Sequence, residues 1–472
     1  MQLGNSTTSL ILDTGSSDLW VMSDQCTTGT CDSSTSVPYI TQPNRRSGGE
    51  VHMKFGDSKT RTHAAGPVVF DTVSVAGISM ADQPFAAINE TDSSAVLNGG
   101  AGIFGLGFPS QSLVEAAVIN NKFDKPETTD VFVANTASAG PLIARMAMSG
   151  ELEQPMFAIT LQRSTVDIGG NEGALTVGRL PTGVDNSSLT WVPVRLYGPA
   201  HGGQDPPSFA ADEVYPLRWE VPLEAVYLDD EKLPDTNLTG DVNAKGLSAL
   251  IDSGNSLLRG PEDVVDHALR MISTQFAADP SADPTFPCST PHSLSFQIGG
   301  QMFPIDPRDF VSRGDATNCT ARLIPTDAPH RAHLHSWSLG APFFRSNLVA
   351  FYFGNLTHPS VDPPRIGFLN TVPSNAGQLL RDAVQNATAN GGRFPSTLEA
   401  APPVMATIHL PATPMTTTPP PAPTVHTQLR LGLATGSTPS PRQASAASSS
   451  FASSVWFSVV LSFTVGLSVV VF

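Results

Sequence analysis

Two stretches of this chain decide how it folds: Leu-Ile-Leu-Asp-Thr-Gly-Ser-Ser at residues 10–17 and Ala-Leu-Ile-Asp-Ser-Gly-Asn-Ser at residues 249–256. In each stretch an apolar, strand-like run delivers one aspartate, Asp13 or Asp252, into a tight turn that contains glycine. An ionised carboxylate at the end of a buried strand is costly unless partners compensate it. The pattern therefore predicts that the two turns face each other and that the two aspartates share one proton.

A second pair of segments repeats at a similar distance from each aspartate. Gly105 lies in Ile-Phe-Gly-Leu-Gly, 92 positions after Asp13, and Gly340 lies in Trp-Ser-Leu-Gly, 88 positions after Asp252. A single Asp-Ser/Thr-Gly tripeptide is an ordinary turn sequence and indicates little. The prediction depends on the fact that both the turn and the later apolar segment with glycine occur twice. A carboxylate pair that titrates as a unit can activate a water for attack on an amide carbonyl.

These residues resemble the pepsin-like aspartic peptidases, a family in which an apolar segment ending in glycine crosses behind each catalytic turn. The resemblance, which is to a fungal type, implies a mainly β, bilobal fold with the active site in the cleft between two β lobes. It also implies hydrolysis of peptide bonds at acid pH by a water that Asp13 and Asp252 activate. The alternative is a catalytically weak or inactive peptidase-fold protein that acts as a cell-surface binding or structural glycoprotein.

The resemblance assigns supporting roles to the three residues after each aspartate, which are Thr14, Gly15, Ser16, Ser253, Gly254 and Asn255. The hydroxyl residue bonds across to the other lobe, the glycine lets the backbone approach the substrate, and the third residue donates to the outer carboxylate oxygen. Asn255 departs from the usual Ser or Thr. Its longer amide can still donate and is expected to change the pKa values of the dyad.

The same resemblance predicts a hairpin flap over the cleft, with Phe55 in place of the usual Tyr, followed by Gly56 and Asp57. Trp20 supplies the indole that normally donates near the Tyr hydroxyl. The missing hydroxyl forfeits a hydrogen bond worth about 1 kcal/mol, or about fivefold in rate if it acts only in the transition state. Asp57 is expected to favour a basic or polar substrate side chain. A further departure, Ala341 in place of the usual Asp, lies behind the site.

The four cysteines occupy positions where pepsin-like peptidases carry disulfides, so the resemblance predicts the pairs Cys26–Cys31 and Cys288–Cys319. Zinc is the competing interpretation, but no histidines fall at ligand spacing beside these cysteines. No metal or other cofactor is therefore expected.

Seven N-x-[ST] sequons accompany the even number of cysteines and favour a secretory route. The sequon asparagines are Asn5, Asn89, Asn186, Asn237, Asn318, Asn355 and Asn386. Acidic residues outnumber basic ones 42 to 26, which argues against a nucleic-acid partner. Polypeptide substrates are expected instead, and the protein is expected to be a monomer.

The composition divides the chain into two β lobes, residues 1–190 and 191–371, a Pro/Thr/Ser-rich stalk over 372–454, and a hydrophobic tail over 455–472. No signal peptide precedes the first hairpin, so the first lobe is expected to be truncated at its start. Within the lobes, helices are expected at 111–122 and 262–275 and strands at 166–170, 174–178 and 365–369, with a further helix at 376–389.

The tail is typical of a GPI-anchor signal, because small residues and a polar spacer precede an apolar stretch that ends the chain. Ser445 is the expected attachment residue, and a plain transmembrane end is the alternative. A lipid anchor would place the protein outside the cell, on the plasma membrane or cell wall.

Overall fold

The computed structural model describes residues 1–394 except 43–44, 59, 125, 239, 241–245 and 313–314, and it does not describe the side chains of residues 46–48. Most of the predicted stalk, the tail over 455–472 and Ser445 therefore lie outside the described residues. Within the described part, none of the helices combines the length and the apolar character needed to span a membrane.

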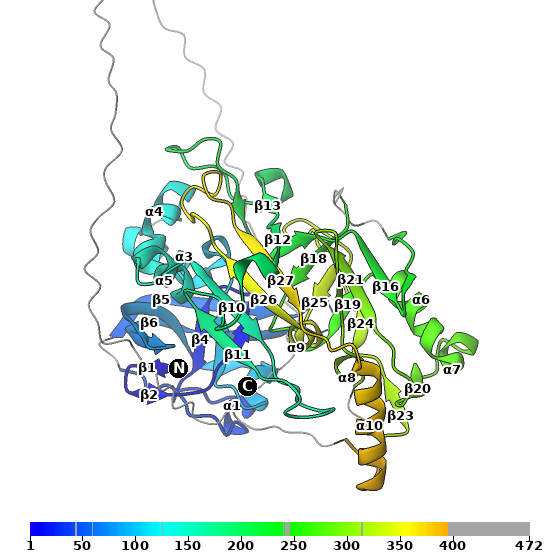
Figure 1. Cartoon of the computed structure of the whole chain (residues 1–472). Helices are drawn as coiled ribbons and strands as arrows, with labels where there is room; N and C mark the ends of the chain where they lie inside the picture. The colour runs from blue at the N-terminus through cyan, green and yellow to red at the C-terminus, as the bar shows by residue number, and fades with distance from the viewer. Residues whose placement is uncertain are drawn as a thin grey trace, which may run out of the picture. The chain divides into compact units, whose positions relative to one another are not determined.

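The first half of the chain builds one large sheet from its first nine strands (Figure 1). These strands are β1 (Gln2–Leu3), β2 (Ser6–Thr7), β3 (Ile11–Asp13), β4 (Leu19–Met22), β5 (Arg46–Phe55), β6 (Thr62–Val75), β7 (Ile78–Ile88), β8 (Glu90–Thr91) and β9 (Gly102–Gly105). Their order is β2-β1-β6-β7-β4-β9-β3, and both β5 and β8 pair with β6. Because β3 and β9 are parallel neighbours with Asp13 opposite Gly105, the predicted crossing segment does lie against the first turn.

Helices cover this sheet more fully than the sequence suggests. They are α1 (Gly29–Asp32), α2 (Ser94–Leu97), α3 (Leu113–Phe123), α4 (Thr129–Ala139) and α5 (Leu142–Ser149). Helix α3 corresponds to the predicted helix at 111–122, and Ser112 caps it by accepting a hydrogen bond from the Glu115 amide at 2.9 Å. Helices α4 and α5 were not predicted from the sequence. Helix α4 contains two Thr and two Val, which do not favour a helix, and it buries Phe132 and Val133.

The second half of the chain builds two further sheets, with strand orders β15-β18-β25-β19-β24 and β17-β16-β21-β22. The strands are β15 (Glu220–Pro222), β16 (Ala225–Leu228), β17 (Glu231–Lys232), β18 (Ser248–Ile251), β19 (Leu258–Gly260), β21 (Leu294–Ile298), β22 (Gln301–Pro304), β24 (Leu323–Pro325) and β25 (Trp337–Leu339). Strands β18 and β25 are parallel, which repeats the β3–β9 arrangement behind the second turn. Smaller ladders join β13 (Leu196–Tyr197) to β14 (Tyr215–Pro216) and β20 (Thr285–Pro287) to β23 (Asn318–Thr320).

Within its described residues, the second half of the chain has five α-helices, and the single helix predicted at 262–275 is two helices in the structure. The five are α6 (Glu262–Ile272), α7 (Thr274–Ala278), α8 (Pro307–Phe310), α9 (Ala341–Ser346) and α10 (Ala376–Ala389). The single helix predicted at 262–275 is divided at Ser273, whose hydroxyl accepts a hydrogen bond from the Phe276 amide at 3.3 Å and so starts α7. Helix α10 begins and ends where the sequence places it.

A five-stranded sheet joins segments from both halves in the order β11-β10-β26-β27-β12 (Figure 1). It contains β10 (Met156–Thr160), β11 (Ala174–Val177), β12 (Thr190–Pro193), β26 (Asn347–Tyr352) and β27 (Arg365–Asn370). The predicted strands at 174–178 and 365–369 are present as β11 and β27. The strand predicted at 166–170 is wrong: the segment turns, with Asp167 at φ 54° and Gly169 at φ 84°. The predicted lobe boundary at residue 190 falls at the start of β12 and stays a prediction.

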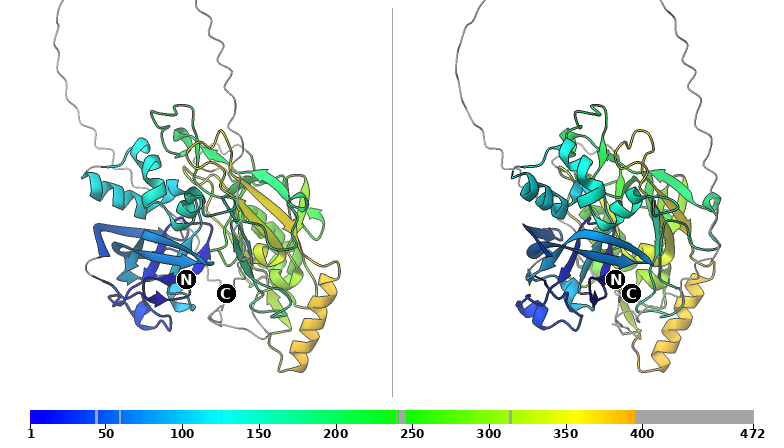
Figure 2. Two further views of the ribbon diagram at one scale, coloured as in Figure 1. Left: turned by 60° about the vertical axis from the view of Figure 1, so that its left-hand side comes forward. Right: turned by 90° about the vertical axis from the view of Figure 1, so that its left-hand side faces the viewer.

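Aromatic side chains pack where this sheet meets the second lobe. The Trp219 ring lies 4.1 Å from that of Phe108 and 5.0 Å from those of Phe351 and Phe353, measured between centroids. The Trp219 indole also donates a hydrogen bond to the Leu106 carbonyl at 2.9 Å. This contact joins a segment beside the first turn to the residue before β15, the strand that pairs with β18. Figure 2 shows the first half of the chain (blue to cyan) beside the second half (green to yellow).

Candidate active site

The two aspartates lie at the ends of equivalent strands. Asp13 is the last residue of β3, and Asp252 directly follows β18. Both are buried, at 0% and 1% exposure. The Gly15 amide donates to Asp13 at 2.8 Å, and the Gly254 amide donates to Asp252 at 3.0 Å. Each carboxylate is thus held by the backbone of its own turn.

Hydrogen bonds from the next residue join the two turns. The Thr14 hydroxyl donates to the Ile251 carbonyl at 2.7 Å and accepts from the Ser253 amide at 2.9 Å. In the reverse direction the Ser253 hydroxyl donates to the Leu12 carbonyl at 2.8 Å and accepts from the Thr14 amide at 3.1 Å. These four buried bonds have the arrangement expected for Thr14 and Ser253, and they fix the two turns against each other.

The glycine of each turn is required because the opposite carboxylate lies against it. A Cβ atom on Gly15 would come within 2.5 Å of an Asp252 oxygen, and a Cβ atom on Gly254 would come within 2.4 Å of an Asp13 oxygen. Any side chain at either position would therefore separate the carboxylates. The structure brings Asp13 and Asp252 together as the sequence predicts.

Burial and mutual repulsion make this pair hard to ionise fully. Burial raises the pKa of Asp13, although hydrogen bonds from Ser16 and Gly15 oppose the rise. Burial, and next the charge of Asp13, raise the pKa of Asp252 well above its ordinary value. Because the two carboxyls lie against each other, the ionisation of one affects the pKa of the other.

The third residues of the two turns behave differently. The Ser16 hydroxyl donates to Asp13 Oδ2 at 2.5 Å, as expected. Asn255 does not take the matching role, because its amide donates to the Ser338 hydroxyl at 2.9 Å and its oxygen accepts from the Leu257 amide at 3.1 Å. This corrects the prediction that Asn255 donates to the second carboxylate, and it leaves the dyad asymmetric.

The flap is the β5–β6 hairpin, with Phe55 paired to Thr62 at its tip. Gly56 turns the chain there with φ 87°, and a Cβ atom would come within 2.2 Å of the Thr60 carbonyl oxygen. The Phe55 ring packs against that of Trp20, with 5.9 Å between centroids. The buried Trp20 Nε1 has no hydrogen-bond partner in the described structure, which is what the loss of the Tyr hydroxyl predicts.

Beyond Gly56 the flap is tied to the second lobe. The Asp57 carboxylate forms an ion pair with Arg259 of β19, and both side chains are largely buried. Asp57 also accepts hydrogen bonds from the Thr60 amide and hydroxyl at 2.9 and 2.8 Å. Asp57 was expected to favour a basic or polar substrate side chain, and this preference stays a prediction. In the structure Arg259 pairs with the Asp57 carboxylate.

A second, more exposed link joins the flap to the segment before β25. The Ser58 amide and hydroxyl donate to the Asp327 carboxylate at 3.0 and 2.6 Å. Below these links, pockets lie on both sides of the dyad. The first is lined by residues that include Gly15, Trp20 and Arg218.

The second pocket is lined by Asp252 and by residues of both flap links. These lining residues include Asp57, Arg259, Asp327, His333 and His335. Burial lowers the pKa of His333 well below its usual value and that of His335 to about 3, and the charge of Arg218 adds to both shifts. In the described part of the chain no group of three or more His, Cys, Asp or Glu side chains is placed to hold a metal ion.

Both predicted disulfides are present, joining Cys26 to Cys31 and Cys288 to Cys319. All seven sequon asparagines are exposed, as a glycosylated residue must be. They are Asn5, Asn89, Asn186, Asn237, Asn318, Asn355 and Asn386.

Two arginines of the site were not identified from the sequence. Arg218 and Arg259 are each 3% exposed, and both line a pocket beside the dyad. The sequence could have indicated both arginines, because each lies next to large apolar residues. The stretches are Leu217-Arg218-Trp219 and Leu257-Leu258-Arg259. Fully buried arginines are rare unless they are paired, so a lone cation in an apolar run marks a specific environment.

Comparison with known proteins identifies the class to which this fold and dyad belong. The family model of the eukaryotic aspartyl proteases matches residues 2–358, and the chain belongs to that family.

Three relatives illustrate how far the similarity extends. Major aspartyl peptidase 1 of Cryptococcus neoformans var. grubii is 25% identical over 381 residues, which cover 77% of this chain but only 65% of the relative, just under two thirds. Pepsin A of Sus scrofa is 26% identical over 72% of this chain and 74% of its own length. Gastricsin of Rattus norvegicus is 25% identical over 73% and 75%, respectively.

Proposed function

We propose that this protein is an aspartic endopeptidase that hydrolyses polypeptides at acid pH. The observation that carries the proposal is the seating of each buried carboxylate against the glycine of the opposite turn. Two carboxyls held this closely cannot both ionise cheaply, so one proton is retained in the acid range. The names of the relatives, which include an aspartyl peptidase and a pepsin, support the same reaction.

The two carboxyls have different hydrogen-bond partners, which suggests which of them is ionised and which is protonated. Asp13 accepts hydrogen bonds from Gly15 and Ser16, whereas the third residue of the second turn is directed elsewhere. Asp13 is therefore the ionised member and Asp252 the protonated one. Asp13 takes a proton from the attacking water, and Asp252 gives its proton to the substrate carbonyl oxygen. The carbon–nitrogen bond then breaks as the amine leaving group takes the proton from Asp13, and Asp252 regains a proton from a hydroxyl of the tetrahedral intermediate.

A second candidate function is a peptidase-fold binding protein with little catalysis. Two observations favour it: the amide of Asn255 is directed to Ser338, and Trp20 lacks the partner that would steady the flap. Both weaken the site, but neither removes a carboxylate. The endopeptidase is therefore the better-supported function.

One assay separates the two candidates. The full-length protein is incubated with an acid-denatured protein substrate at about pH 3 to 6, with and without a statine-containing peptide that mimics the transition state. Cleavage that the statine peptide blocks is expected. Tight statine binding without any cleavage would favour the binding protein, and neither binding nor cleavage would contradict both.

We also propose a secretory route, which is supported by the two disulfides and the seven exposed sequon asparagines. A GPI anchor at Ser445 stays a prediction, because that residue and the tail lie outside the described residues. Release of the protein from cells by a phosphatidylinositol-specific phospholipase would support the anchor. Recovery of residues 455–472 in the membrane-bound protein would contradict it.

A further inference from the structure

Arg218 is a buried cation beside the dyad whose partners are neutral. It precedes β15 and is 3% exposed. Its Nε donates to the Ala332 carbonyl at 3.2 Å, and its Nη2 contacts His333 Nε2 at 3.0 Å. Burial, and next the Arg218 charge, lower the pKa of His333 well below its usual value, which disfavours its charged form. Neither contact therefore neutralises the guanidinium.

The nearby carboxylates do not pair with it directly. Within the described residues, no ion pair includes Arg218. Glu220 follows two positions later, but its carboxylate pairs with Arg195 at 2.8 Å and accepts from the Ser248 hydroxyl at 2.6 Å. The dyad carries one negative charge shared between two carboxyls when it is singly protonated. A buried charge without a matched partner is costly, which makes a ligand carboxylate a favourable addition.

The same arginine lines the first pocket, which also lies against residues of the flap. The other lining residues include Ser16 of the first turn, Phe55 of the flap and Lys54, whose side chain is exposed. Asp18 also lines this pocket, but its carboxylate accepts from the Ser112 hydroxyl and the Leu113 amide at the start of α3. The pocket therefore offers two cations and one carboxylate that is already occupied.

We infer that this pocket selects an acidic side chain, glutamate or aspartate, at one substrate position next to the scissile bond, with Arg218 as the residue that determines the preference. The inference rests on the proposed endopeptidase function. Among the described residues, no hydrogen bond uses Nη1 of Arg218, and this nitrogen is the donor for the substrate carboxylate. Lys54 adds a second positive charge from the flap side.

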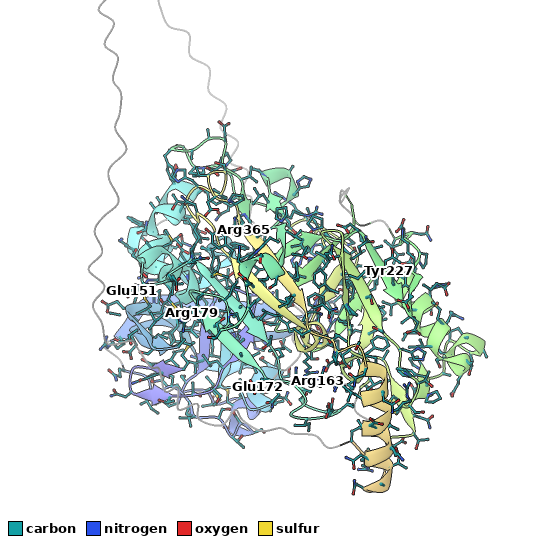
Figure 3. The ribbon with its side chains drawn as sticks, viewed as in Figure 1. Glu151, Arg163, Glu172, Arg179, Tyr227 and Arg365 are labelled. Atoms are coloured by element: carbon teal, nitrogen blue, oxygen red, sulfur yellow. A yellow bond between two sulfur atoms is a disulfide. The ribbon has the colours of Figure 1, made fainter. Side chains whose placement is uncertain are left out.

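The test uses peptide pairs that differ only by Glu or Gln at each position flanking one scissile bond. At about pH 5 a substrate glutamate is largely ionised, and at about pH 3 it is largely protonated. We expect kcat/KM to favour Glu over Gln by at least about tenfold at one position at pH 5, because hydrogen bonds to charged groups are strong. The preference should fall at pH 3. Arg218→Gln should abolish it, and Arg179→Gln, a change at an exposed arginine labelled in Figure 3, should leave it intact.

Binding provides a second readout that does not depend on turnover or on the folding of the variant. Statine peptides carrying Glu or Gln at the same position are titrated into the unmodified protein, and the ratio of the two Kd values should match the kinetic preference. Equal cleavage and equal binding of the Glu and Gln peptides at every position would overturn the inference while leaving the peptidase intact. Absence of cleavage, with Glu statine peptides still preferred, would support the acidic pocket and remove the proposed reaction instead.

Discussion

The indole of Trp20 has an unusual environment for a fully buried residue. It is 0% exposed, its ring packs on Phe55, and its Nε1 hydrogen has no acceptor in the described structure. A buried donor left without a partner costs about 1–3 kcal/mol. The family resemblance assigns this partner to a Tyr hydroxyl at position 55, where the chain has Phe.

Phe55→Tyr is therefore expected to raise kcat/KM by up to about tenfold, since one hydrogen bond would steady the closed flap. The comparison is made on a single peptide substrate at fixed acid pH. In a Trp20→Phe background the added hydroxyl has no indole to bind, so the same change should give no gain. An equal gain in both backgrounds would show that the indole is not involved.

Asp18 links pH to stability at a single residue. Burial raises its pKa to about 6 from 3.8, so the folded state binds the proton more tightly than the unfolded state. The cost of ionising Asp18 in the folded protein is present above about pH 6 and disappears as the pH falls towards 3.8. The sign is thus opposite to that of a salt-bridged carboxylate.

Asp18→Asn should reduce the difference in the free energy of unfolding between pH 4 and pH 7 by roughly 2 kcal/mol, because the variant has no charge to bury. Urea unfolding at the two pH values measures this difference. Asp185→Asn, at an exposed residue, serves as the matched control and should not change it. A difference as large in Asp18→Asn as in the parent would refute the assignment.

Residues whose partners are close in sequence could be predicted, and residues with distant partners could not. Ser16 reaches Asp13 within its own turn, so the motif alone places it. Asn255 has the same place in its turn, but it is drawn away by Ser338, which lies 83 positions later. Arg259 meets Asp57 across 202 positions, and no local pattern indicates such a contact.

At the scale of elements, the flap is closed by contacts with the second lobe rather than by its own hairpin. Asp57 pairs with Arg259 inside the protein, and Ser58 binds Asp327 at the surface. Breaking a buried ion pair by removing one partner typically costs 3–5 kcal/mol, whereas an exposed link contributes about 1 kcal/mol or less. The buried pair should therefore dominate the closed state.

Arg259→Gln is expected to speed hydrogen exchange of the β5 and β6 amides next to the flap tip by at least about tenfold, because it removes the positive charge that faces the buried Asp57 carboxylate. Ser58→Ala should have a much smaller effect. The double change Asp57→Asn with Arg259→Gln should cost less free energy of unfolding than the two single changes summed. Unchanged exchange in Arg259→Gln would show that the ion pair does not hold the flap.

Elements with strong local signals were predictable, and those held by packing were not. Helix α10 was predicted at its observed bounds, and the two crossing strands β9 and β25 were placed from their glycines. Helix α4 was missed because its β-branched and polar residues do not favour a helix on their own. The turn at 166–170 was mistaken for a strand, although its two glycines favour a left-handed backbone.

At the scale of the whole described molecule, buried charges join the segments around the cleft. Arg163, labelled in Figure 3, pairs with Asp306 at 3.1 Å and with Asp309 at 2.9 Å, which ties the segment after β10 to α8. The turns that carry Asp13 and Asp252 are joined by the neutral hydrogen bonds of Thr14 and Ser253. The dyad therefore depends on the alignment of two lobes.

Several buried carboxyls share the behaviour of Asp18. Burial raises the pKa of Glu115 well above its ordinary value, and it also raises that of Asp309. Together with the dyad, these groups make the folded state bind protons more readily than the unfolded chain as the pH falls. Their summed effect stabilises the folded state relative to the unfolded chain as the pH falls, which suits a protein that acts at acid pH.

The central claim is that Asp13 and Asp252 act as one catalytic unit, and the most direct test measures peptide hydrolysis at acid pH by the full-length protein and by three variants. The account predicts that Asp13→Asn, Asp252→Asn and the double change each abolish cleavage to a similar extent, because losing either carboxyl disables the shared proton. A cooperative thermal unfolding transition would show that each variant is folded. Substantial cleavage by either single variant would contradict the account.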